Sequence, residues 1–319
     1  MAALYLALGL CSLLLALALL GVLVPLLRSL GRTGKDVNKP DRPEVVEMGG
    51  IGVVLAALLA ILLAILLQGM GIIDTAIDGQ VLGAAAFSLI VIAAIGAVDD
   101  LLEIPQAVKA VLPMLAGLPL LLVLQGTTIF LPLVGDVDFG VFYFAILFLS
   151  IAVSSNLTNM LAGFNGMEYG MALPMYAGSF AFGALLGQPI MMFLSATMFG
   201  ACLAGFWFGF PKARAFPGDT GTLSIGGMLA VMLMLGHVEK YAFVLLPYVL
   251  DFFIKAANGF PSKNWWGEYR DGKLYCPGGK FRGFAQFVMK KANGIRETDL
   301  VLLFIGLEAL CVLAAFLLF

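Results

Sequence analysis

The fold follows from one stretch, Asp99-Asp100-Leu101-Leu102-Glu103-Ile104-Pro105-Gln106-Ala107-Val108-Lys109, and from the uncharged runs on either side of it, residues 79–98 and 110–135. Each run is long enough to cross a bilayer, because a transmembrane helix needs about 20 predominantly apolar residues. The charges between the runs therefore mark a membrane boundary. Two adjacent carboxylates repel each other, and such a pair persists most easily beside a metal ion, a lysine or a proton transfer. The alternative is a solvated turn between two membrane helices.

Outward from this stretch, the same pattern divides the whole chain. Hydrophobic residues make up 61% of the 319 and charged residues 12%, against about 45–50% and about 25% in soluble proteins. The uncharged or nearly uncharged runs are 1–27, 48–73, 79–98, 110–135, 139–167, 169–211, 220–238, 241–254 and 300–319. Gly187-Gln188-Pro189 predicts a turn that divides run 169–211 into two helices. We expect an all-α polytopic membrane protein with about ten transmembrane helices, forming one membrane-embedded domain over residues 1–319.

Lysines and arginines predict the orientation of this bundle. Lys240 is the single basic residue in a loop that follows an even-numbered helix; all others follow odd-numbered ones. Basic residues favour cytoplasmic loops, so the odd loops are expected in the cytoplasm and both termini outside. The longest cytoplasmic loop covers about 255–298. We expect an integral, multi-pass membrane protein, located in the plasma membrane if the source is prokaryotic or archaeal.

Several functional classes are disfavoured by composition. A net charge of −2 and the absence of a basic domain give no indication of nucleic-acid binding. The four cysteines show no CxxC spacing and read as small hydrophobic residues. His237, the one histidine, falls on the predicted outer side, so histidine acid–base catalysis is not expected.

The polar segments all fall on the predicted cytoplasmic side: 28–47, 99–109, 154–168, 211–222 and 255–298. A transporter or lipid flippase, the competing class, should place ionisable groups near the bilayer midplane or on both faces, usually with repeated halves. The sequence shows no such repeat. One-sided clustering favours an enzyme that takes a soluble substrate from the cytoplasm and a lipid substrate from the bilayer.

Three of these segments carry further polar patterns. In 154–168, asparagines three residues apart share a helical face and Gly163 lets backbone approach a ligand, although asparagine also caps helices. In 211–222, Asp219 at the start of an apolar run suits a metal ligand or a simple N-cap. In the last loop, Asp271-Gly272 predicts a tight hairpin turn. Its basic and aromatic residues suit either a pyrophosphate and sugar or the anionic membrane surface.

With these segments identified, the chain resembles the polyprenyl-phosphate N-acetylhexosamine-1-phosphate transferases. This superfamily includes the eukaryotic dolichyl-phosphate GlcNAc-1-phosphotransferase and the bacterial phospho-MurNAc-pentapeptide translocase. The resemblance is carried, in the family's order, by Gly34-Lys35-Asp36-Val37-Asn38-Lys39 with Glu47-Met48-Gly49-Gly50, by Asp99-Asp100 with Lys109, by Asn159-Met160-Leu161-Ala162-Gly163-Phe164-Asn165-Gly166-Met167-Glu168, and by Phe216-Pro217-Gly218-Asp219-Thr220-Gly221. The third segment is similar to the eukaryotic pattern, whereas the bacterial translocase has aspartates there.

The resemblance implies transfer of a sugar 1-phosphate from a UDP-sugar, most simply UDP-GlcNAc, to a dolichyl or polyprenyl phosphate. The products would be UMP and a lipid-linked sugar pyrophosphate, in the first step of lipid-linked oligosaccharide synthesis for N-glycosylation. Inhibition by tunicamycin is also implied. The alternative within the same class is a bacterial-type transferase that acts on undecaprenyl phosphate. Small residues in the helices are compatible with a homodimer without requiring one.

Site residues follow from the same resemblance. Mg²⁺, with Mn²⁺ as an alternative, is expected between the two anionic substrates, held by Asp219 and Asn159. Lys109 is expected to neutralise charge, and Asp99 or Asp100 to deprotonate or orient the lipid phosphate. The donor would be contacted by the following residues: Glu47, Gly163, Asn165 and Phe216, with Phe216 stacked on uracil and Asn165 hydrogen-bonded to it. The chain departs from the family in having no histidine in the last loop. The candidate cations there are Lys263, Arg270 and Arg282.

Overall fold

Long apolar helices dominate the computed structural model, which describes residues 1–102, 104–131, 134–261 and 266–318. Within this described part, eight helices are long and apolar enough to cross a membrane. They are α1 (Ala2–Ser29), α2 (Gly50–Gly69), α3 (Gly79–Leu102), α5 (Phe142–Met160), α6 (Met167–Leu186), α7 (Pro189–Gly209), α8 (Gly218–Gly236) and α11 (Glu297–Leu318). The predicted all-α polytopic class is confirmed. The turn predicted between the halves of run 169–211 is also confirmed, with Gly187 in the left-handed conformation and Pro189 opening α7.

Two of the ten predicted spans differ from the prediction, because neither is one long helix. Run 110–135 forms short pieces: α4 (Gln106–Val111), the 3-10 helices η1 (Leu112–Gly117) and η2 (Pro119–Leu122), and a hairpin of β3 (Thr128–Leu131) and β4 (Gly135–Asp138). Run 241–254 forms the 3-10 helix η3 (Glu239–Leu245) and then α9 (Leu246–Ala257). Prolines at the start of η1, η2 and α9 explain the breaks, because proline lacks the N–H that an α-helix interior requires.

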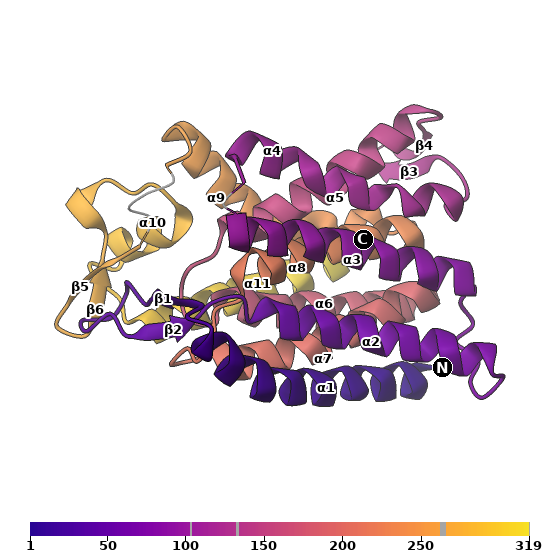
Figure 1. Ribbon diagram of the computed structural model, residues 1–319. Coiled ribbons are helices and arrows are strands. Elements are labelled where there is room, and N and C mark those ends of the chain that lie inside the picture. The colour runs from indigo at the N-terminus through magenta and orange to yellow at the C-terminus, as the bar shows by residue number, and fades with distance from the viewer. Residues whose placement is uncertain (103, 132–133, 262–265, 319) are drawn as a thin grey trace.

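The predicted cytoplasmic segments lie together at one end of the bundle, hereafter the site end (Figure 1). It carries the hairpin of β1 (Thr33–Lys35) and β2 (Glu44–Val46), the hairpin of β5 (Glu268–Arg270) and β6 (Lys273–Tyr275), the 3-10 turn η4 (Pro277–Gly279) and α10 (Phe284–Lys291). The β3–β4 hairpin and the N-terminus lie at the other end. The β5–β6 turn has Asp271 and Gly272 at positive φ, which confirms the predicted hairpin.

Helix α8 lies at the centre of the bundle, and most of its residues are buried. Close packing on α3 and α2 requires glycine at the contact points. A Cβ on Gly96 would lie 2.5 Å from the Cα of Thr220, and a Cβ on Gly50 would lie 2.4 Å from the backbone nitrogen of Gly221. Because α3 approaches α8 this closely, the C-terminal turn of α3 lies beside the N-terminus of α8.

Candidate active site

Lys109 joins two of the predicted acids. Its Nζ lies 2.5 Å from Oδ2 of Asp99 and 2.6 Å from Oδ2 of Asp219. The chain turns back between α3 and α4, which brings Lys109 to Asp99. Helix α3 ends after Leu102, Pro105 precedes α4, and Asp99 accepts a hydrogen bond from the backbone N–H of Ile104 at 2.7 Å. Residues 110 positions apart are thereby brought to one point.

The charge state of Lys109 follows from these contacts. Burial disfavours its ammonium form, since Lys109 is only 7% exposed. The carboxylates of Asp219 and Asp99 outweigh that effect and raise the pKa of Lys109 above its usual value. Lys109 therefore stays a cation at neutral pH and supplies positive charge rather than acting as a base.

Asp100 has a different set of partners from Asp99. It accepts hydrogen bonds from the backbone N–H of Asp219 at 2.6 Å, from the backbone N–H of Thr220 at 3.1 Å and from the Thr220 hydroxyl at 2.8 Å. A carboxylate at a helix N-terminus satisfies unpaired N–H groups and interacts favourably with the helix dipole. Asp100 thus fixes the first turn of α8, whereas Asp99 fixes Lys109.

Asn159, in the last turn of α5, completes this group. Its Nδ2 donates to Oδ1 of Asp219 and, at 2.8 Å, to the hydroxyl of Thr222. The preceding residue, Thr158, also links α5 to α8, because its hydroxyl donates a hydrogen bond to the carbonyl oxygen of Thr222 at 2.8 Å. We call Asp99, Lys109, Asn159 and Asp219 the lysine cluster.

The lysine cluster has donors that suit a magnesium ion. Mg²⁺ prefers oxygen ligands and keeps several waters, so it needs few protein groups. Asp219 offers a carboxylate oxygen. Asn159 can offer its amide oxygen if the amide group rotates by about 180°, because the Thr222 hydroxyl can then donate to the amide instead of accepting from it. Among the residues that the structure describes, no group of three or more His, Cys, Asp or Glu side chains could hold a metal. An ion here would therefore complete its coordination with water and substrate oxygens.

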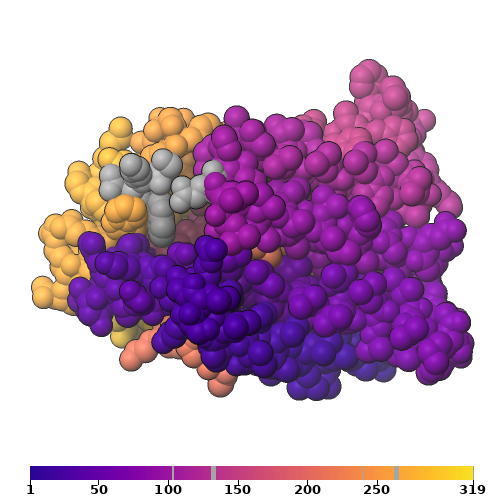
Figure 2. All heavy atoms as spheres, in the orientation of Figure 1, coloured from indigo at the N-terminus to yellow at the C-terminus, as the bar shows by residue number. Residues whose placement is uncertain are grey.

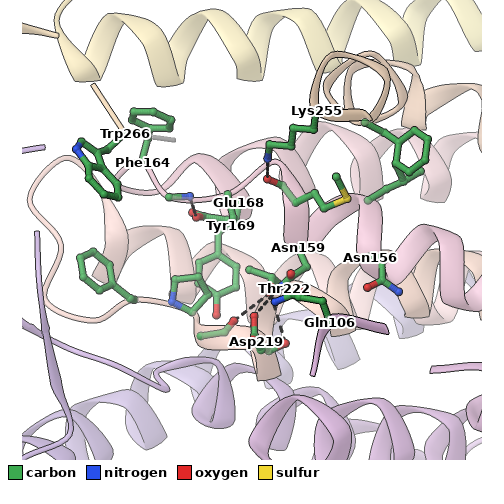
Figure 3. A pocket seen from close by; sticks show the side chains of 18 of the residues that line it. Gln106, Asn156, Asn159, Phe164, Glu168, Tyr169, Asp219, Thr222, Lys255 and Trp266 are labelled. Carbon is green, nitrogen blue, oxygen red and sulfur yellow. Dashed lines mark hydrogen bonds between the residues drawn. The ribbon is translucent and has the colours of Figure 1, made fainter. Parts of the chain in front are cut away.

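A cavity of about 1200 Å³ opens beside the lysine cluster (Figure 3). Its polar part is lined by Glu47, Asn159, Gly163, Phe216 and Asp219. Its apolar part is lined by side chains of η1, α5 and α9, namely Met114, Leu149, Val153, Val249, Phe252 and Phe253. One continuous space therefore joins a charged end to an apolar end lined by η1, α5 and α9.

Glu47 and Phe216, two of the predicted donor-contacting residues, are held against the polar part by backbone pairing. The N–H of Phe216 donates to the carbonyl oxygen of Val46 at 2.7 Å, and the N–H of Gly49 donates to the carbonyl oxygen of Phe216 at 2.8 Å. Burial, and then the charge of Asp100, raises the pKa of Glu47.

Asn165 does not line the cavity, unlike its neighbours Phe164 and Gly166. It is buried, its Nδ2 donates to Oδ2 of Asp36 at 2.9 Å, and its backbone N–H donates to Oε1 of Glu297 at 2.9 Å. Lys39 forms ion pairs with both of those acids. We call Asp36, Asn38, Lys39, Asn165 and Glu297 the loop network; it joins the first loop, the α5–α6 loop and the start of α11. A contact between Asn165 and uracil stays a prediction.

The last-loop cations are not brought to the cavity wall in the described part of the chain. Arg270 is exposed and pairs with Glu268 on its own hairpin. Arg282 is half-buried and lies outside the lining. Lys263 lies outside the described residues. The cations that do line the cavity are Lys35 and Lys255, and Lys255 pairs with Asp251 at 2.8 Å.

Glu168, Tyr169, Lys255 and Trp266 also line the cavity, although they were not selected as site residues from the sequence (Figure 3). The oxygen Oε1 of Glu168 accepts a hydrogen bond from the backbone N–H of Gly163 at 2.6 Å. A signal was present for Glu168, which ends the asparagine-rich segment, and for Trp266, which lies among the basic and aromatic residues of the last loop. Lys255 stands at the end of an apolar run, and only the packing of α9 on α5 shows that it lines the cavity.

Comparisons with known proteins identify relatives along most of the chain. The family model described as glycosyl transferase family 4 matches residues 81–237, which include most of the lysine cluster's helices. A protein of Saccharolobus solfataricus, provisionally named UDP-N-acetylglucosamine–dolichyl-phosphate N-acetylglucosaminephosphotransferase, is 31% identical over 87% of this chain and 85% of its own length. A protein of Sulfolobus acidocaldarius with the same provisional name is 33% identical over 92% of this chain and 89% of its own.

A more distant relative carries that enzyme name without the provisional qualifier. It comes from Dictyostelium discoideum and is 27% identical over 72% of this chain and 65% of its own length. The two archaeal similarities extend over nearly the whole chain, beyond the segment that the family model matches. Together with the match to the family model, they show that this chain belongs to glycosyl transferase family 4.

Proposed function

We propose that this protein transfers GlcNAc 1-phosphate from UDP-GlcNAc to dolichyl phosphate or a related polyprenyl phosphate, and releases UMP. One observation carries the proposal: a single cavity runs from Asn159 and Asp219 of the lysine cluster to an apolar wall built by η1, α5 and α9. A water-soluble donor and a lipid acceptor need such a joint space. The names of the relatives supply the sugar and the lipid.

The reaction joins two anions, so positioning and charge neutralisation are its main requirements. An oxygen of the lipid phosphate attacks the β-phosphorus of the donor and forms a new P–O bond. The bond from that phosphorus to the bridging oxygen breaks, and UMP leaves with the electron pair. Lys109 does not line the cavity itself, but it pairs with Asp219, which does, and its positive charge would lower the repulsion between the phosphates from there.

Asp219 and Asn159 would hold Mg²⁺, which supplies further charge neutralisation when bound. Asp100 keeps Asp219 in place by fixing the first turn of α8. Asp99 is the carboxylate available to accept a proton from, or orient, a lipid phosphate that displaces it from Lys109. The isoprenoid would lie along the apolar wall lined by Val153, Phe252 and Phe253.

The site end faces the cytoplasm in this proposal. The basic residues of the β1–β2 loop and of the last loop gather there, as the positive-inside tendency predicts. The product would then enter lipid-linked oligosaccharide synthesis as its first intermediate.

A direct test uses protein purified in detergent, labelled UDP-GlcNAc and two acceptors, dolichyl phosphate and undecaprenyl phosphate. We expect UMP release and a labelled lipid pyrophosphate, both dependent on Mg²⁺ and both abolished by EDTA. The Asp219→Ala variant should lose nearly all transfer, while Asp136→Ala, an exposed aspartate in the far hairpin, serves as the matched control. Wild-type turnover in Asp219→Ala would overturn the assignment.

A further inference from the structure

One buried side chain, Asn38, joins three loops of the site end. Its Nδ2 donates to the carbonyl oxygen of Gly163 at 3.0 Å, and its Oδ1 accepts from the backbone N–H of Gly267 at 3.1 Å. Asn38 is 2% exposed. A primary amide offers a donor and an acceptor on two separate atoms at the end of one short side chain. Figure 2 shows the first and last loops packed against each other at this end.

Gln286, on α10, holds the same part of the last loop from another direction. Its Nε2 donates to the carbonyl oxygen of Trp266 at 2.9 Å, and its Oε1 accepts from the N–H of Arg282 at 2.8 Å. The side chain is 1% exposed. The carbonyl of Trp266 and the N–H of Gly267 belong to one planar peptide unit. That unit is therefore fixed at both of its polar atoms, by Gln286 and by Asn38.

The fixed peptide places an aromatic side chain on the cavity wall. Trp266 lines the polar part of the cavity, as does Phe164, which follows the glycine that Asn38 also holds. In Figure 3 both rings lie on the same side of the cavity, away from Asn156. Flat aromatic rings pack well against a nucleobase or against the apolar face of a sugar ring. The lipid has its own wall on η1, α5 and α9, so this wall suits the donor.

We propose that Asn38 is a positioning residue for the nucleotide-sugar donor, which acts by fixing the Trp266–Gly267 peptide so that Trp266 forms a wall of the donor pocket. The inference rests on the proposed function. It adds a specific contact, Trp266, and a specific mechanical link between the first and last loops.

The test measures binding of labelled UDP-GlcNAc to detergent-purified protein, together with KM for each substrate. Asn38→Ala, Gln286→Ala and Trp266→Ala should each weaken donor binding by about 10-fold, the expected scale for one lost buried hydrogen bond or one lost stacking contact. The KM for dolichyl phosphate should stay within about 2-fold, because the lipid wall is untouched. Asn258→Ala is the matched control, since its amide donates to the Ile254 carbonyl within α9 and Asn258 is not among the described residues that line the cavity.

Coupling between variants separates positioning from general destabilisation. Asn38→Ala combined with Trp266→Ala should bind donor no more weakly than Trp266→Ala alone, because Asn38 acts through Trp266. Trp266→Phe, which keeps a flat ring, should retain most of the affinity. Additive losses in the double variant, or an equal rise in KM for the lipid, would overturn the proposal. So would wild-type affinity in both Gln286→Ala and Trp266→Ala, which test the wall even if Asn38→Ala folds poorly. Wild-type protein that binds donor without releasing UMP would refute the proposed function alone.

Discussion

The lysine cluster and the loop network lie at the same end of the molecule but are built in different ways. The lysine cluster takes its side chains from α3, α4, α5 and α8, and the close approach of Gly96 to Thr220 sets where α3 meets α8. The loop network takes its side chains mainly from loops and holds them by mutual hydrogen bonds and ion pairs. Helix packing thus places the charges that the proposed transfer needs, whereas loop contacts shape the end of the cavity assigned to the donor in that proposal.

This difference predicts unequal sensitivity to mutation. Loss of a charge in the lysine cluster should impair turnover directly. Loss of a bond in the loop network should act mainly on donor binding, as proposed above for Asn38.

The largest effect is expected for Lys109→Met. The change leaves the buried Asp99 and the half-buried Asp219 without their cation, and it removes positive charge from the proposed site of phosphoryl transfer. We expect kcat to fall by about 10³-fold or more, on the scale of losing a group that stabilises the transition state. UMP release measures this, with Lys273→Met on the exposed β5–β6 hairpin as the control. Comparable turnover in the two variants would contradict the role of Lys109.

A large effect through helix packing is expected for Gly96→Ala. The new Cβ would lie 2.5 Å from the backbone of Thr220, so α3 and α8 must move apart. Overpacking of this kind costs about 1–3 kcal/mol of stability, and here it also displaces Asp99 and Asp100 from the start of α8. The temperature of thermal unfolding and the rate of UMP release should both fall. Gly83→Ala on the same helix has open space around it and should change neither. Equal behaviour of the two variants would show that the contact does not set the site.

A moderate effect, confined to the lipid, is expected for Val153→Trp. Val153 lines the apolar part of the cavity, and a larger side chain there would obstruct an isoprenoid. The KM for dolichyl phosphate should rise by about 10-fold, equivalent to the contact of one or two methylenes, while donor binding is unchanged. Val98→Trp, on an exposed face of α3 outside the cavity, is the control. A change in donor affinity instead would reverse the assignment of the two parts of the cavity.

The smallest effect is expected for Arg270→Ala. The Arg270 side chain is 60% exposed, and within the described residues it forms an ion pair with Glu268 and lies 5.8 Å from the ring centroid of Tyr275, both on its own hairpin. Exposed ion pairs contribute about 0–1 kcal/mol, so the folding equilibrium constant and kcat should each change by less than about 5-fold. Steady-state kinetics with UDP-GlcNAc measures kcat. A loss of 10-fold or more in kcat would show that the last loop brings Arg270 to the phosphates during turnover.

Much of the fold was predictable because a bilayer imposes strict rules on sequence. Uncharged runs of sufficient length gave eight spans, and the Asp271-Gly272 pair gave its hairpin. The runs 110–135 and 241–254 were less predictable, since hydropathy measures apolar content and not whether prolines allow one continuous helix.

The site was predictable in part, and for a different reason. Asp99 and Lys109 stood out because charges at a membrane boundary need a partner, and Asp219 because an acid at the start of an apolar run suits a metal ligand or an N-cap. Nothing in the order of residues showed that Asp100 would hold α8 while Asp99 held Lys109, because the two aspartates are adjacent and identical in type. The engagement of Asn165 by Asp36 joins positions 129 residues apart, which no local pattern reports.

The sequence by itself determined the membrane class, most of the spans and the residue types of the active site, since these depend on hydropathy and charge along the chain. Tertiary structure decided which acid pairs with Lys109, which loops enclose the cavity and that Trp266 forms part of its wall. Those features depend on how closely helices approach at Gly50 and Gly96, and on hydrogen bonds between segments that are distant in sequence.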